Sequence, residues 1–155
     1  MLPFPLTLAL TSAVSGALCA RWPARIITTV GFVFLLISTL MFTFVGTQPS
    51  LSYIVLAQLV MGAGSGTFQV PNNNTVISAA PKGKLGVVAS INALARNFGM
   101  IAGIALSVAV FAWVQRYCLA HGANAQQSFM SGYQTAMLLG TFFAIAGGIL
   151  SAKRD

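Results

Sequence analysis

Hydrophobic residues run along this chain in long, nearly uninterrupted stretches, separated by short segments that hold most of the charged and turn-forming residues. A helix of about 20 apolar residues covers the roughly 30 Å hydrocarbon core of a bilayer. Five stretches reach that length, so the pattern predicts an all-α polytopic membrane protein. It forms one transmembrane domain over residues 1–155. The predicted spans lie near Leu2–Ala20, Ile26–Gly46, Leu51–Val70, Val87–Val114 and Gly132–Leu150.

Composition excludes a soluble domain. Only 6% of the residues are charged, whereas a soluble domain carries about 25%. The net charge of +7 does not indicate nucleic-acid binding, because the bases are spread over several short segments without interleaved aromatic residues. Membrane topology and contact with anionic lipid headgroups account for them, so the lipid bilayer is the expected partner.

The basic residues also predict an orientation. They cluster in the Arg21–Arg25 loop, the Lys82–Lys84 loop and the Lys153–Arg154 tail, which share one side if the spans alternate. The positive-inside rule places that side in the cytoplasm. We therefore expect a multi-pass protein of the cell's inner (plasma) membrane, with its N-terminus outside and its C-terminus inside.

The end of the third span is rich in glycine and amides. Gly62, Gly64 and Gly66 permit close helix packing in lipid, and Gly62 and Gly66 form a G-x-x-x-G pair. Gln58 and Gln69 share their helix face. Amides inside a span need partners, either in another helix or in a wet cavity, so helix–helix bonding and substrate lining both remain open.

Pro71-Asn72-Asn73-Asn74 follows directly. Proline removes a backbone donor and disfavours helix before it, and asparagine favours caps and turns. The third span is therefore predicted to kink or end at Pro71, at the cytoplasmic mouth.

The fourth span begins with a second polar segment. At helical spacing Asn92, Arg96, Gly99 and Gly103 fall on one face. Arginine is costly inside a membrane and normally turns toward protein or water, so Arg96 could line a transport path. The charge-free run from Asn97 to residue 115 is itself long enough to span. Arg96 could therefore equally snorkel to the interface, and both readings stay open.

No reaction chemistry is apparent in the chain. The one acid is Asp155, and His121 stands alone in a loop, so there is no metal-ligand cluster and no nucleophile with a base. We expect no enzyme activity, no metal and no cofactor.

Two adjacent segments resemble the late spans of the fourteen-helix drug:proton antiporters of the major facilitator superfamily. They are the glycine–asparagine run Gly62-x-Gly64-x-Gly66 to Pro71-Asn72-Asn73-Asn74, and Ala95-Arg96-Asn97-x-Gly99-Met100-x-x-Gly103. The segment Gly16-x-Leu18-x-x-Arg21-x-x-x-Arg25 is similar to the degenerate second copy of the superfamily's cytoplasmic-loop motif. It departs from that motif at two positions, with Ala20 where the motif usually carries Asp and Pro23 where it carries Gly.

The resemblance implies a partial C-terminal helix bundle, the last five spans of a proton-driven multidrug exporter. The missing N-terminal helices would be its partners and small hydrophobic or cationic drugs its substrates, by alternating access. Such a piece is not expected to transport alone. The alternative is a non-transport membrane interaction protein or an inert remnant of a transporter gene. The candidate residues of the transport path or gate are Gln58, Gln69, Asn72, Asn73, Asn92, Arg96 and Asn97; those of helix packing are Gly62, Gly64, Gly66, Gly99 and Gly103; those of the loop motif are Gly16, Arg21 and Arg25.

Overall fold

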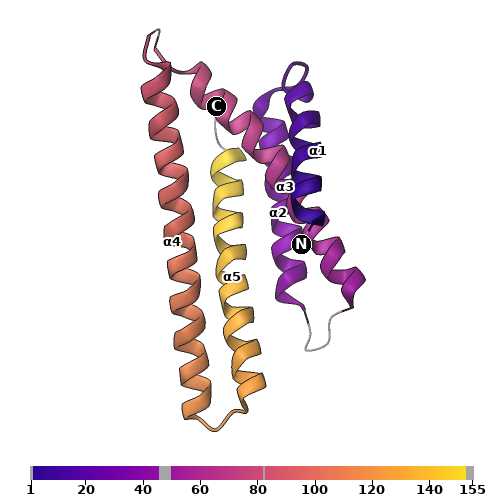
Figure 1. Cartoon of the computed structure of the whole chain (residues 1–155), viewed down its shortest axis with the longest axis vertical. Helices are drawn as coiled ribbons and strands as arrows, with labels where there is room; N and C mark the ends of the chain where they lie inside the picture. The colour runs from indigo at the N-terminus through magenta and orange to yellow at the C-terminus, as the bar shows by residue number, and fades with distance from the viewer. Residues whose placement is uncertain (1, 46–49, 82, 153–155) are drawn as a thin grey trace.

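The protein is described by a computed structural model over residues 2–45, 50–81 and 83–152. Throughout these residues it is helical and contains no strand, which confirms the predicted all-α membrane fold. Figure 1 shows the helices running up and down in alternation. They are α1 (Pro3–Leu18), α2 (Ala24–Thr43), α3 (Leu51–Ser78), α4 (Leu85–Ala120) and α5 (Ala125–Ala152).

The lengths of the helices differ from the prediction at several ends. Helices α2 to α5 are long and apolar enough to cross a membrane. In contrast, α1 has 16 residues, about 24 Å at 1.5 Å per residue, and so is shorter than the span predicted over Leu2–Ala20. The predictions for Gly46, Lys82, Lys153 and Arg154 fall outside the described residues.

The connection between the last two helices is much shorter than the sequence suggested. The spans predicted over Val87–Val114 and Gly132–Leu150 leave Arg116–Ser131 in a loop, but most of this segment is helical in the structure, because α4 continues to Ala120 and α5 begins at Ala125. Gly122 turns the chain with a φ of +82°, a conformation that glycine adopts without strain. A single tight turn therefore replaces an extended loop.

Helix α3 continues through Pro71 and ends at Ser78. The expectation that the third span could end at Pro71 is therefore wrong, and Asn72, Asn73 and Asn74 belong to the helix instead of a cap. This places Asn73 on the last two turns of a long helix that leads toward α4.

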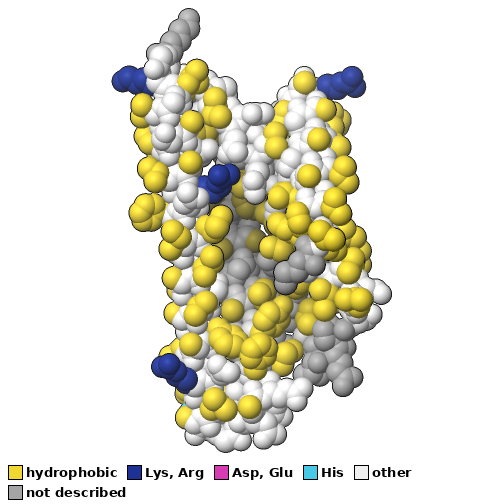
Figure 2. Space-filling model, in the orientation of Figure 1, with side chains coloured by type: hydrophobic (Ala, Val, Ile, Leu, Met, Phe, Trp, Pro, Cys, Tyr) yellow, Lys and Arg dark blue, Asp and Glu magenta, His cyan; other side chains and the backbone are white. Residues whose placement is uncertain are grey.

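The packing follows the spatial order α1, α3, α2, α5, α4. Helix α3 packs against both α1 and α2, α2 packs against α5, and α5 packs against α4, whereas α3 and α4 touch over only a short stretch. Figure 2 shows the molecule hollowed between α4 on the left and α1–α3 on the right. Within the described part of the chain, α4 has no buried residue.

One end of the molecule carries the loops predicted to be basic. The α1–α2 and α3–α4 connections lie at the top of Figure 1, and α5 ends on the same side of the molecule, somewhat lower. Arg21, Arg25 and Lys84 belong to this end, which we call the basic end. Figure 2 shows dark-blue basic side chains there, and others lower along α4.

Candidate functional site

The main polar contact between α3 and α4 joins two residues that the sequence singled out. The side-chain nitrogen Nδ2 of Asn92 donates a hydrogen bond to Oδ1 of Asn73, at 3.0 Å. Both side chains are partly buried. In a low-dielectric environment an amide needs a partner, so this bond links two helices that otherwise meet sparsely. We call it the amide pair.

The amide pair depends on α3 remaining helical beyond Pro71, and a side chain of α1 supports that continuation. Proline has no N–H, so the carbonyl of Thr67, four residues earlier, loses its helical donor. The hydroxyl of Ser15 donates to this carbonyl oxygen at 3.2 Å. Ser15 is 2% exposed, and Pro71 is fully buried. A neighbouring helix thus satisfies the backbone group that proline frees, as lipid-embedded helices require.

Sequence reasoning missed Ser15. A serine in a span usually bonds a carbonyl of its own helix, so nothing about Ser15 alone marks it. The signal that could have found it is Pro71 itself, because a proline within a span implies a donor for the fourth carbonyl before it.

The remaining residues proposed for the path or gate are dispersed. Gln58 borders a small pocket of 260 Å³ with Phe4, Phe42 and Met61, toward the end of α3 opposite the amide pair. Gln69 and Asn72 are partly exposed on α3, and Arg96 and Asn97 are exposed on α4. The structure therefore brings Asn73 and Asn92 together, with Arg96 one turn beyond Asn92, and does not gather all seven residues at one place.

The alternate glycines of α3 face two different helices. A Cβ atom on Gly62 would lie 2.8 Å from the carbonyl oxygen of Phe4, and one on Gly66 would lie 2.8 Å from that of Leu8, both in α1. A Cβ on Gly64 would instead lie 2.8 Å from the backbone nitrogen of Leu35 in α2. The absence of side chains at these positions lets α3 approach α1 and α2 closely on opposite faces.

Gly99 and Gly103 of α4 lie in a different environment. Among the described residues, no atom lies within 4 Å of a Cβ placed on either of them. They do not mark a close helix contact here; both line an open groove of 410 Å³ between α4 and α5. No described helix packs closely on Gly99 or Gly103, and their role in helix packing stays a prediction.

The three residues of the loop motif lie around the first turn at the basic end. Gly16 is in the last turn of α1, where an added Cβ would be 3.9 Å from a methyl group of Val70. Arg21 lies in the α1–α2 connection and Arg25 in the first turn of α2, and both are exposed.

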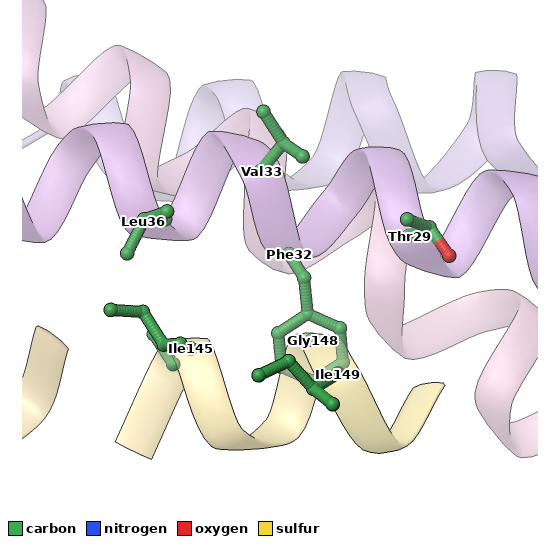
Figure 3. A pocket seen from close by; sticks show the side chains of 8 residues that line it. Thr29, Phe32, Val33, Leu36, Ile145, Gly148 and Ile149 are labelled. Carbon is green, nitrogen blue, oxygen red and sulfur yellow. The ribbon is translucent and has the colours of Figure 1, made fainter. Parts of the chain in front are cut away.

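The apolar pocket between α2 and α5 is a packing site. Figure 3 shows the Phe32 ring pointing from α2 onto the α5 backbone at Gly148. A Cβ on the adjacent Gly147 would lie 2.8 Å from the ring, so the two glycines form a notch that Phe32 fills. The pocket between α2 and α5 has a volume of 250 Å³ and is lined almost wholly by carbon atoms. Phe32 also packs on Phe68 of α3, at 4.7 Å between ring centroids.

The part of the chain that the structure describes contains no group of His, Cys, Asp or Glu that could hold a metal. Its charged residues are all basic, since Asp155 lies outside it. The polar groups at the amide pair are neutral, so the arrangement can bind or release by hydrogen bonding and has no acid–base pair for a covalent step.

These features define a polytopic helical membrane protein whose helices α1 to α3 pack closely through glycines and leave a hollow toward α4. A family model described as Major Facilitator Superfamily matches residues 1–104, which cover α1 to α3 and the first part of α4. The chain belongs to the Major Facilitator Superfamily, a family of transporters.

Several curated transporters are similar to the chain over about two thirds of its length. The riboflavin transporter RibZ of Clostridioides difficile is 29% identical over 108 residues, which cover 70% of this chain and 24% of RibZ. The quinolone resistance protein NorB of Staphylococcus aureus is 32% identical over 106 residues, 66% of this chain and 20% of NorB. The uncharacterized transporter YebQ of Escherichia coli is 29% identical over 104 residues. The chain thus matches about a quarter of the length of these relatives.

Proposed function

We propose that this chain is the C-terminal portion of a secondary active transporter that exports small hydrophobic or cationic drugs by proton antiport. Membership of the Major Facilitator Superfamily supports a role in transport. The similarity to NorB, whose name refers to quinolone resistance, favours drug efflux as the specific activity. The late-span motifs described above point the same way.

The observation that carries this proposal is the amide pair. Asn73 and Asn92 close the sparse α3–α4 contact near the basic end. A single neutral hydrogen bond in a membrane is worth about 0.6 kcal/mol on average, so it is weak enough to open and re-form within a transport cycle. We propose that it forms part of the gate, with the basic end facing the cytoplasm of the inner membrane.

Proton coupling would come from residues outside this chain. The sequence has one acid, Asp155, and no carboxylate in any helix, so it offers no proton-binding carboxylate within the membrane. We therefore propose that the missing N-terminal helices of the same transporter are the partners, that they carry the proton site, and that the chain does not transport alone.

The experiment compares the chain alone with a chimera. In the chimera, the 155 residues replace the matching C-terminal segment of S. aureus NorB. Both are reconstituted in liposomes with an imposed proton gradient and a fluorescent cationic dye. We expect no dye movement above protein-free liposomes for the chain alone and gradient-dependent movement for the chimera.

Two outcomes would contradict the proposal. Transport by the isolated chain would show that it needs no partner helices. A chimera that inserts normally but stays inactive with dyes and quinolones would favour the alternative, a non-transport interaction protein or remnant. Helix α4, which has no buried residue, would be the surface for such an interaction.

A further inference from the structure

The pocket between α2 and α5 stays open beside the packed Phe32 ring. It has a volume of 250 Å³ and extends along α2 from Thr29 to Leu36. Figure 3 shows these two residues on either side of Phe32, and Ile145 and Ile149 on α5. The pocket is therefore an elongated apolar groove between two helices, which we call the α2–α5 groove.

The α2–α5 groove opens on the side of α2 that faces away from α3. Gly31 faces α3, because a Cβ built on it would lie 2.8 Å from the backbone nitrogen of Phe68. Thr29 and Val33 each lie two residues from Gly31, and two residues turn an α-helix by about 200°. The sparse α3–α4 contact, where packing is incomplete, lies beyond α3 on the opposite side. The groove is thus on the outer surface of well-packed helices, where an apolar lining meets lipid chains.

Hydroxyl groups surround the end of the groove that lies toward the basic end. The Thr29 hydroxyl belongs to the groove lining and donates to the carbonyl oxygen of Arg25 at 2.8 Å. Ser151 of α5 donates to the Thr28 hydroxyl at 3.2 Å, so it joins the two helices there. The surface therefore changes from apolar to polar along the groove, in the same direction as a bilayer changes from hydrocarbon to headgroups.

Arg25 places a positive charge one turn beyond the groove. It is exposed and precedes Thr29 by four residues, which is about 6 Å along the helix axis and within about 40° around it. A lipid phosphate lies outside the space that holds its acyl chain, so a cation that binds it belongs just beyond the lining. Trp22 lies three residues earlier and is 56% exposed. Exposed tryptophan settles at headgroup level, which gives Arg25 the same depth.

Charge favours an anionic lipid at this position. Every charged side chain that the structure describes is basic, and Asp155 lies outside that part of the chain. A guanidinium presents a planar set of donors that matches phosphate oxygens. Basic residues beside a membrane span also attract lipids of net negative charge.

We infer that α2 and α5 hold an anionic phospholipid whose phosphate lies at Arg25 and one of whose acyl chains lies in the α2–α5 groove. Leu36 follows Arg25 by 11 residues, about 17 Å along the helix. One leaflet contributes about 15 Å to a hydrocarbon core of roughly 30 Å. A single acyl chain therefore reaches from the guanidinium to the far end of the groove. This binding is independent of the transport activity proposed above.

The test is lipid retention by the full 155-residue chain. The protein is released from nanodiscs that contain equal amounts of phosphatidylglycerol and phosphatidylcholine with the same acyl chains, and bound lipid is weighed by native mass spectrometry. We expect retained lipid to be enriched in phosphatidylglycerol. Arg25→Gln should reduce that enrichment about fivefold, the effect of one basic residue at a membrane surface, and Arg25→Lys should keep most of it. Ala144→Leu should reduce retention of both lipids, because Ala144 lines the groove and the larger side chain fills it.

Two matched variants serve as controls. Lys84→Gln removes one exposed positive charge from the α3–α4 connection at the same end of the molecule. Ala9→Leu makes the same substitution at an exposed alanine of α1. Both should retain lipid as the unaltered chain does, and circular dichroism should show equal helix content in all variants.

Several results would overturn the inference. Equal losses of enrichment in Arg25→Gln and Lys84→Gln would mean general attraction to a positive protein. Displacement of phosphatidylglycerol by inorganic phosphate, with no effect of Ala144→Leu, would mean a site for a free anion. A dimer that disappears in Ala144→Leu while lipid retention is unchanged would mean that a second copy of the chain occupies the groove.

Discussion

Two buried serines with different surroundings show how single hydroxyl groups act in this protein. Ser15 of α1 donates to the Thr67 carbonyl that Pro71 leaves without its helical donor. Ser38 of α2 is 0% exposed, and its Oγ has no hydrogen-bond partner among the described residues. The same side chain therefore stabilises one helix contact and is an unsatisfied polar atom in another.

This contrast gives the first prediction. Ser15→Ala should lower the free energy of unfolding by about 1 kcal/mol, because it leaves the Thr67 carbonyl without a donor. Ser38→Ala should leave stability unchanged or raise it slightly, because it removes a buried oxygen that makes no bond. Thermal unfolding in detergent, followed by circular dichroism, measures both. Equal destabilisation by the two variants would show that the Ser15–Thr67 bond has no special role.

The amide pair gives the second prediction. In a double-mutant cycle, Asn73→Ala and Asn92→Ala should be coupled by about 0.6–1.7 kcal/mol, the range of interhelical hydrogen bonds in membranes. Asn72→Ala is the neighbouring control, and it should show no coupling to Asn92→Ala. Unfolding by increasing fractions of a denaturing detergent provides the free energies, and additive effects at positions 73 and 92 would contradict a bond between them.

At the scale of helices, the sequence predicted the positions of the helices better than their ends. The apolar runs predicted where each helix lies, since a bilayer demands about 20 apolar residues per span. They did not predict where helices end, because the segments 115–120 and 125–131, in which polar and apolar residues mix, extend α4 and α5 beyond the apolar runs. The predicted end of α3 at Pro71 was wrong for a related reason. The carbonyl that Pro71 leaves without a donor is bonded by Ser15, a residue 56 positions earlier in the sequence.

The candidate site was predictable only in part. Asn73 and Asn92 could be identified as amides within apolar surroundings, but their pairing depends on how α3 leans toward α4. The glycines show the same limit. Gly66 and Gly99 look alike in sequence, yet one touches a neighbouring helix and the other borders an open groove.

That difference gives the third prediction. Gly66→Ala should destabilise the protein by about 1–3 kcal/mol, because the new methyl group overlaps the α1 backbone at Leu8 and Ser12. Gly99→Ala is the control and should raise stability slightly, by up to about 1 kcal/mol, because the methyl group enters open space and alanine favours the helix. The apparent melting temperatures of the purified variants test this, and a neutral Gly66→Ala would contradict the close α1–α3 packing.

At the scale of the molecule, α3, α2, α5 and α4 follow one another in a ring. The broad contacts of α3 with α2, α2 with α5 and α5 with α4 form most of this ring, and the sparse α3–α4 contact closes it at the amide pair. Because the weakest contact lies at the basic end, opening there disturbs the least packing. This arrangement is the physical basis for assigning the gate to Asn73 and Asn92.

The most direct test of that assignment is to measure efflux with the α3–α4 contact fixed. In the NorB chimera, Asn73→Cys and Asn92→Cys are introduced after Cys19 and Cys118 are changed to serine, and a short, reducible bis-thiosulfonate joins the pair. We predict that cross-linking abolishes proton-driven dye efflux and that reduction restores it, while each single-cysteine protein treated in the same way stays active. Undiminished efflux by the cross-linked chimera would contradict the assignment of the gate to this contact.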